Sequence, residues 1–193
     1  MQETGSGLVA HYYFDCHDSA KRDVRGLLAS LLIQLGDLSR HCWDVLYHLY
    51  TSCHDGSEQP SFRTLAKCLY RMLRLLKEVP VFIIIDALDE CRSNTGHPSA
   101  REKVLVLVEH LIRSKLSTLH ICITSRAEQD IRAVLGPLTS ASRRISLHEE
   151  PGQREDINSY IHSFVHRDRT MRRWRREDKA LVIDTLSKRA DGM

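Results

Sequence analysis

Apolar residues occur along this chain in two patterns, short continuous runs and longer stretches at helical spacing. The continuous runs predict strands, because buried parallel strands are apolar on both faces and rich in β-branched and aromatic residues. They cover residues 8–14, 81–85 and 119–124, with a shorter strand expected at 144–147. Apolar residues three or four positions apart predict helices at 24–35, 39–50, 61–76, 99–112, 131–135, 153–165 and 178–190. Strands that alternate with helices predict a doubly wound α/β fold around a parallel sheet.

Polar residues mark where several of these elements begin and end. Asp18 and Ser19 are expected to cap the first helix, and Gly36 is expected to end it. Ser61 is expected to cap the third helix, and Ser99 with Glu102 three residues later forms a capping-box pattern. After His148 the pattern becomes purely helical. We therefore expect two parts, an α/β domain over residues 1–148 and the start of a helical subdomain over residues 149–193.

Three acids follow the apolar run Val81–Ile85 within five positions, at Asp86, Asp89 and Glu90. A carboxylate at the carboxyl end of a parallel strand lies where open α/β sheets bind ligands. Phosphate chemistry uses one acid there to hold Mg²⁺ and a second to orient water. Many buried strands simply end in an acid and a turn, but Asp-Ala-Leu-Asp-Glu after four apolar residues is more specific. We interpret it as the Walker B box of a P-loop NTPase.

The next predicted strand also ends in polar residues, Thr124-Ser125-Arg126. A guanidinium is planar and binds phosphate through two hydrogen bonds, so Arg126 could contact a γ-phosphate or a neighbouring subunit. The alternative is an ordinary surface arginine at a strand end. Its position one β-α unit after the acids favours the nucleotide site.

The loop that would hold the phosphates is missing from this sequence. A P-loop requires Gly-x-x-x-x-Gly-Lys-Ser/Thr, and no segment of the chain matches it. Gly5-Ser6-Gly7 has no following lysine and is interpreted as a flexible lead-in. The chain therefore carries half of a nucleotide site, and we do not expect it to hydrolyse ATP or GTP by itself.

Three segments together resemble the NACHT domains of signal-transducing (STAND) NTPases, with the fungal NOD-like receptor type, whose N-terminal region is also called nephrocystin-3-like, as the nearest match. They are Tyr12-Tyr13-Phe14-Asp15, Ile84–Cys91 and His120–Arg126. The resemblance covers nearly the whole chain, including Met171–Arg175 and the terminal Ala190-Asp191-Gly192-Met193. It implies truncation at both ends, with the Walker A strand before Met1 and winged-helix and repeat regions after Met193.

The resemblance also implies a role for each residue of the site. Asp86 would associate with Mg²⁺ through water, and Asp89 and Glu90 would position the attacking water, with Glu90 as the base. Thr124 and Arg126 would face the γ-phosphate, Arg126 as the sensor 1 arginine. The complete domain would bind Mg-ATP or Mg-GTP, and this chain alone is expected to bind neither tightly. Its expected function is a cytoplasmic, nucleotide-dependent oligomerisation switch in innate-type signalling, with itself or other signalling domains as partners.

The same resemblance predicts the order of the strands in space. The absent Walker A strand would lie between 119–124 and 144–147. The remaining order should be 8–14, 81–85, 119–124, followed by a gap or an improvised pairing with 144–147.

Composition argues against nucleic-acid binding, membrane spans, disulfides and zinc. The net charge of +3 does not imply nucleic acid, and no apolar run approaches the roughly 20 residues of a membrane span. Six scattered cysteines without a Cys-x-x-Cys pair indicate reduced thiols of a cytosolic protein. A zinc site is not favoured, because His11, Cys16 and His17 lack a second ligand pair at the usual spacing.

Two other functions remain open. The chain could be a non-catalytic interaction module. A cluster of arginines around Trp174, within residues 167–176, could bind nucleic acid or an anionic membrane. Asp168, Glu177 and Asp178 balance that cluster, so we interpret it as a solvated linker and helix start. Nucleic acid and membrane partners are therefore not expected.

Overall fold

The computed structural model describes residues 7–93, 98–146 and 151–189. The chain divides into two compact units, Met1–Thr139 and Ser140–Met193. The first holds the sheet and most of the helices, and the second is helical. This division falls ahead of the change in sequence pattern after His148.

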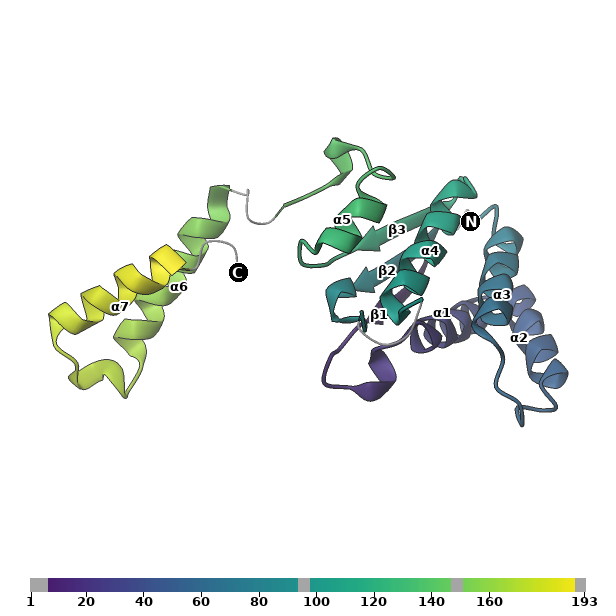
Figure 1. The fold of residues 1–193 in the computed structure, drawn as a ribbon, viewed down its shortest axis with the longest axis horizontal. Helices are drawn as coiled ribbons and strands as arrows, with labels where there is room; N and C mark the ends of the chain where they lie inside the picture. The colour runs from purple at the N-terminus through teal and green to yellow at the C-terminus, as the bar shows by residue number, and fades with distance from the viewer. Residues whose placement is uncertain (1–6, 94–97, 147–150, 190–193) are drawn as a thin grey trace, which may run out of the picture. The chain divides into compact units, whose positions relative to one another are not determined.

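Three parallel strands form the sheet of the first unit, in the spatial order β1 (Leu8–Tyr13), β2 (Val81–Asp86) and β3 (Leu119–Ile123) (Figure 1). In the register of the sheet, Tyr13 pairs with Asp86 and Ile85 pairs with Ile123. The predicted order of these three strands is therefore confirmed. Their carboxyl ends lie together at one edge, where the acids follow β2.

The connections between these strands are helical. Helices α1 (Val24–Leu38), α2 (Arg40–Ser52) and α3 (Phe62–Leu75) join β1 to β2, α4 (Ala100–Arg113) joins β2 to β3, and α5 (Gln129–Leu135) follows β3. The strands follow one another in space as they do in the sequence. Right-handed crossovers that all advance in the same direction place their helices on the same face of a sheet.

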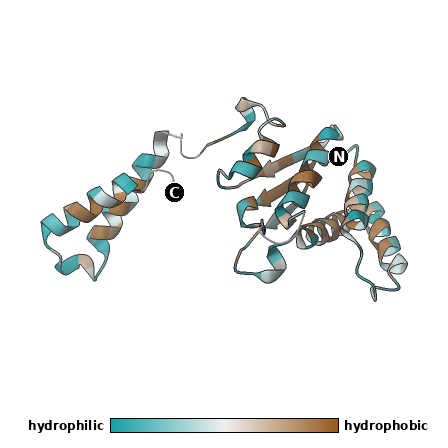
Figure 2. Ribbon diagram, viewed as in Figure 1, coloured by the Kyte–Doolittle hydropathy of each residue, from teal (hydrophilic) through white to brown (hydrophobic). Residues whose placement is uncertain are grey.

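Burial along the strands agrees with this one-sided arrangement. Ala10 and Ile83 are fully buried on the helix-covered face, whereas Val9 and Phe82 on the opposite face are 48% and 40% exposed. The core under the helices is largely leucine, with Val81, Ile83 and Ile85 from β2. Figure 2 shows the hydrophobic residues of the strands in brown. Each such side chain contributes roughly 1.5–3 kcal/mol when it is removed from water.

The first helix begins and ends differently from the sequence prediction. Asp23 caps it by accepting a 2.8 Å hydrogen bond from the N–H of Gly26, while Ser19 lies in a short 3-10 helix, η1 (Ser19–Lys21). Gly36 lies inside α1, which continues to Leu38. A Cβ at Gly36 would lie 2.4 Å from Leu46 Cδ1, so this glycine permits close packing of α1 on α2 rather than ending the helix. The predicted caps of α3 at Ser61 and of α4 at Ser99 are confirmed.

The prediction of a strand at 144–147 is wrong for residues 144–146, and Leu147 lies outside the described residues. A 3-10 helix, η3 (Ala141–Arg143), is followed there by irregular chain, and Ile145 is 79% exposed. A parallel strand needs a hydrogen-bonded neighbour. Residues 144–146 have none, so β3 is an edge strand within the described part of the chain.

The second unit consists of α6 (Pro151–Arg167), the 3-10 helix η5 (Met171–Arg173) and α7 (Arg176–Arg189). Val165 and Ile161 of α6 are buried. The Thr170 hydroxyl and the N–H groups of Met171 (3.1 Å) and Thr170 (2.7 Å) donate hydrogen bonds to Asp168 Oδ1, and they lower the pKa of that carboxyl. These bonds fix the turn between the two helices.

None of the helices in the described ranges combines the length and the apolar character that crossing a lipid bilayer requires.

Candidate functional site

A strained turn carries the acids away from the end of β2. Asp86 is the last residue of the strand, and Ala87 follows in the left-handed region at φ 52° before the 3-10 helix η2 (Leu88–Glu90). Such a conformation costs a non-glycine residue of order 1–3 kcal/mol and persists where neighbouring structure fixes it. Here two bonds of 3.0 Å do so, from Ala87 N to Thr124 Oγ1 and from Leu88 N to the Thr124 carbonyl. The turn after β2 is thus anchored to the end of β3.

Thr124 also orients the first acid. Its hydroxyl donates a hydrogen bond to Asp86 Oδ1 while it accepts from Ala87 N. The hydroxyl is therefore used in both directions, and the Oδ2 atom of Asp86 is left for a cation or water. The structure brings these two predicted site residues together at the carboxyl edge of neighbouring strands.

Asp89 is held by Arg126. Its Oδ1 accepts a 3.0 Å hydrogen bond from Arg126 N, and its Oδ2 lies 3.4 Å from Arg126 Nε. The Asp89 side chain is 11% exposed, whereas that of Arg126 is 82% exposed. Asp89 therefore fixes the loop after β3 in this conformation, and the guanidinium of Arg126 remains open to solvent on its other side.

Glu90 faces the other neighbour of β2. Its Oε2 accepts a 2.8 Å hydrogen bond from Cys16 N in the turn that follows β1. The three acids thus separate: Asp86 and Asp89 bond to the end of β3, and Glu90 bonds to the end of β1. All three lie at the same edge of the sheet, but Glu90 has a different set of neighbours.

Sequence reasoning missed Arg101, a buried side chain of α4 that holds the loop after β2. It is 8% exposed, and its guanidinium donates to the carbonyl oxygens of Cys91 (3.2 Å) and Asp89 and pairs with Asp130 at 3.3 Å. One side chain of α4 thereby ties the loop after β2 to α5. No local pattern distinguishes Arg101 from a surface residue in the first turn of a helix, because its partners belong to other elements.

The donor set at this edge is compatible with Mg²⁺. Magnesium is held by carboxylate oxygens and keeps several waters and phosphate oxygens, so one oriented acid suffices from the protein. Asp86 supplies that acid. The phosphates themselves would find Thr124 and Arg126, but no lysine and no glycine-rich loop in residues 1–193.

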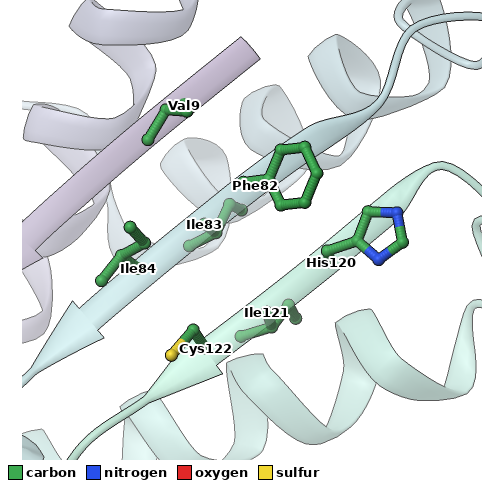
Figure 3. Close-up of a pocket in the computed structure, with 7 residues that line it drawn as sticks. All are labelled: Val9, Phe82, Ile83, Ile84, His120, Ile121 and Cys122. Carbon is green, nitrogen blue, oxygen red and sulfur yellow. The ribbon is translucent and has the colours of Figure 1, made fainter. Parts of the chain in front are cut away.

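A second surface feature lies on the face of the sheet opposite its helices, which no described part of the first unit covers. A hollow of about 330 Å³ runs across the three strands, and Phe82 and His120 stack beside it with ring centroids 4.8 Å apart (Figure 3). Its lining is apolar apart from His120, and consists of Val9, Phe82, Ile83, Ile84, His120, Ile121 and Cys122. Parallel sheets are normally covered on both faces, so this surface is suited to a further apolar element.

Comparison with protein-family models gives a match that covers more than half of the chain. Residues 1–126 match the family described as Nephrocystin 3, N-terminal. No curated protein and no solved structure matches the chain. The matched range includes β1, β2 and β3, and the site residues Asp86, Asp89, Glu90, Thr124 and Arg126.

Proposed function

The chain belongs to the family of the nephrocystin-3 N-terminal domain, which is related to NACHT-type domains, and from this membership we propose that it is the Walker B and sensor part of a NACHT-type nucleotide switch. In this proposal the bound nucleotide selects between conformations that differ in self-association. The switch would operate in innate-type signalling in the cytoplasm, as in the fungal NOD-like receptor type of NTPase. Its partners would be further copies of itself or other signalling domains.

The observation that carries the proposal is that side chains link the carboxyl ends of β2 and β3. Asp86 and Thr124 are hydrogen-bonded, and the Asp89–Arg126 pair joins the loops that follow. Nucleotide phosphates bind at the carboxyl edge of parallel sheets, where an acid for the metal and a polar group on the next strand face the same space. Both occur here on neighbouring strands.

Each residue has a distinct role in this proposal. Asp86 would hold Mg²⁺ through water, and Thr124 would keep its carboxylate oriented. Glu90 would orient the attacking water, and Arg126 would contact the γ-phosphate. Mg²⁺ would supply charge neutralisation for the phosphates of ATP or GTP.

In this proposal a segment outside residues 1–193 supplies the phosphate-binding loop, because the sequence has no Gly-x-x-x-x-Gly-Lys-Ser/Thr. The edge of β3 offers a place for it. A parallel strand added there would bring a loop at its carboxyl end next to Thr124 and Arg126, since parallel strands end at the same edge. This chain alone should therefore bind nucleotide weakly.

The test compares the 193-residue chain with the same chain joined to a segment that carries a glycine-rich phosphate loop. Titration with a fluorescent ATP analogue and Mg²⁺ should give no tight binding for the chain and micromolar binding for the joined protein. Asp86→Ala in the joined protein should abolish the Mg²⁺ dependence. Tight binding and steady turnover by the 193-residue chain itself would show that the nucleotide site needs no added phosphate loop, which contradicts the proposal. Failure of the joined protein to bind nucleotide would refute the nucleotide site.

The uncovered sheet face favours a second candidate function, a non-catalytic interaction module. In that case the apolar hollow around Phe82 would bind another protein, and nucleotide would have no effect on that association. Sedimentation with and without Mg-ATP on the joined protein separates the two functions. Association that responds to nucleotide supports the switch, and association that ignores it supports the module.

A further inference from the structure

The turn that follows β1 places three metal-binding side chains together. Asp15, Cys16 and His17 each offer one ligand atom, and these atoms lie within 4.8 Å of one another. Among the residues that the structure describes, no other three His, Cys, Asp or Glu side chains place their ligand atoms this close together. All three are at least partly exposed, so an ion from solvent can reach them.

Both separations from His17 Nδ1 match those around tetrahedral zinc, and the third pair of ligand atoms lies within 4.8 Å. His17 Nδ1 lies 3.4 Å from Cys16 Sγ and 3.4 Å from Asp15 Oδ1. Zinc bonds of about 2.3 Å to sulfur and about 2.0–2.2 Å to nitrogen or oxygen, at tetrahedral angles, place neighbouring ligand atoms about 3.4–3.6 Å apart. An ion can therefore bind with small adjustments of exposed side chains.

The backbone of this turn is fixed before any ion binds. Asp15 Oδ1 accepts a 2.8 Å bond from His17 N, and Asp15 N donates to the Lys21 carbonyl at 3.2 Å. Glu90 holds Cys16 N from the side of β2. A turn held at both ends loses less conformational entropy when it binds a ligand than a flexible loop does.

The spacing of ligands in the sequence did not favour zinc, but the fold adds the Asp15 carboxylate to Cys16 and His17. We propose that Cys16 Sγ, His17 Nδ1 and the Asp15 carboxylate bind one Zn²⁺ ion, with a fourth position open to solvent. A thiolate, an imidazole and a carboxylate form a donor set that suits zinc and does not suit Mg²⁺, which takes oxygen ligands. The site is distinct from the Asp86 position and does not rest on the proposed nucleotide function. Because Glu90 bonds to the ligand turn, the zinc site borders the acid edge of the sheet.

The chain contains an internal control with the same residue types. Cys53, His54 and Asp55 are also consecutive, yet their ligand atoms are not grouped in this way. His54 Nδ1 instead lies 3.5 Å from Glu58 Oε1, and both His54 and Asp55 adopt positive φ angles. Sequence alone makes the two segments equivalent as metal sites, and only the folded backbone separates them.

The test uses Co²⁺ and Zn²⁺ with the reduced 193-residue chain, in the absence of nucleotide. One equivalent of Co²⁺ should produce a thiolate-to-cobalt charge-transfer band and the visible bands of a tetrahedral site, and one equivalent of Zn²⁺ should displace it. Cys16→Ser should abolish the charge-transfer band, and both it and His17→Ala should weaken zinc binding by about 10-fold or more. Cys53→Ser should leave the spectrum and the affinity unchanged, and circular dichroism should show the same fold for all variants.

An octahedral spectrum without charge transfer in the unaltered chain would overturn the proposal. So would a charge-transfer band that persists in Cys16→Ser or disappears in Cys53→Ser. The nucleotide titration described above is independent of this result. Zinc binding at Cys16 with no nucleotide binding by the joined protein would leave the zinc site standing and remove only the proposed switch.

Discussion

The Thr124 hydroxyl donates a hydrogen bond to Asp86 Oδ1 and accepts one from Ala87 N, so that one side chain directly after β3 fixes both the acid at the end of β2 and the turn after it. This relationship joins two strands through side chains at the place where their backbone pairing stops. It also fixes the direction of the Asp86 carboxylate.

Thr124→Val tests that relationship, because it keeps the shape of the side chain and removes the hydroxyl. It removes the bonds to Ala87 N and Asp86 Oδ1 at an exposed position, which should lower the free energy of unfolding by about 0.5–1.5 kcal/mol. Urea denaturation followed by circular dichroism measures this. Thr124→Ser retains the hydroxyl and should stay close to the parent, and equal losses in both variants would show that packing rather than the hydrogen bond is responsible.

Glu90→Gln and Asp86→Ala should have different effects once a phosphate loop is joined to the chain. Glutamine keeps an oxygen that can accept from Cys16 N, so the turn should stay in place, and ATP should still bind. Turnover should fall by about 10²–10⁴-fold, because the group that orients water loses its charge. Asp86→Ala should weaken Mg²⁺-dependent binding itself. Phosphate release and nucleotide titration measure the two effects, and Glu90→Gln with the parent's turnover would show that this acid is not the base.

Arg101→Met should destabilise the first unit although no sequence pattern singles out Arg101. The methionine fills much of the same volume but leaves the carbonyl oxygens of Asp89 and Cys91 without their donor. The expected loss is about 1–3 kcal/mol in the free energy of unfolding. Asp130 is 44% exposed, so Asp130→Asn should cost less. Urea midpoints that order the two variants the other way would contradict this role for Arg101.

Alkaline solution should destabilise the chain through buried groups that stay protonated in the folded state. Burial raises the pKa of Cys91 to about 12 and the pKa of Tyr12 to about 12. Below about pH 8 both groups are neutral in the folded and unfolded states, and their contribution to stability is fully present. As the pH rises toward about 12 they ionise first in the unfolded chain, so stability falls.

The comparison with Cys91→Ala and Tyr12→Phe measures this effect. Each variant removes one titrating group, so the fall in its urea midpoint between about pH 9 and pH 12 should be shallower than that of the parent. A parent and a double variant with parallel pH profiles would show that these groups do not cause the alkaline loss.

The uncovered sheet face should bind a hydrophobic dye and promote association. Phe82 is 40% exposed there and stacks on His120, and β3 is an edge strand among the described residues. Exposed apolar faces and unpaired strand edges are common sites of association. Phe82→Ser should therefore lower both dye fluorescence and the aggregation rate.

A control for that experiment is Tyr47→Ser on α2, since Tyr47 is 58% exposed but lies outside the sheet. This change should alter neither readout. Dye binding that falls equally in both variants would mean that the sheet face is not the surface responsible.

The order of the strands was predicted from the family resemblance. The sequence by itself determined three of the four predicted strands, the caps of α3 and α4, and the grouping of Asp86, Asp89 and Glu90 after β2. These features depend on residues close together in the chain, whose spacing fixes side-chain direction and local hydrogen bonds. The start of α1 at Asp23 and the place of Gly36 inside it could not be predicted, because several residues nearby can cap a helix and because the contact of Gly36 with Leu46 belongs to another helix.

Tertiary structure alone decided which partner each polar group of the site has. It paired Asp89 with Arg126, turned Glu90 toward Cys16 and buried Arg101 beneath the loop. Among the described residues of the first unit, it placed no element over one face of the sheet. It also left residues 144–146 irregular, because a strand forms only where a neighbour accepts its hydrogen bonds. The same principle separates Asp15-Cys16-His17 from Cys53-His54-Asp55: identical donor types become a metal site only where the folded backbone brings their atoms to bonding distance of one ion.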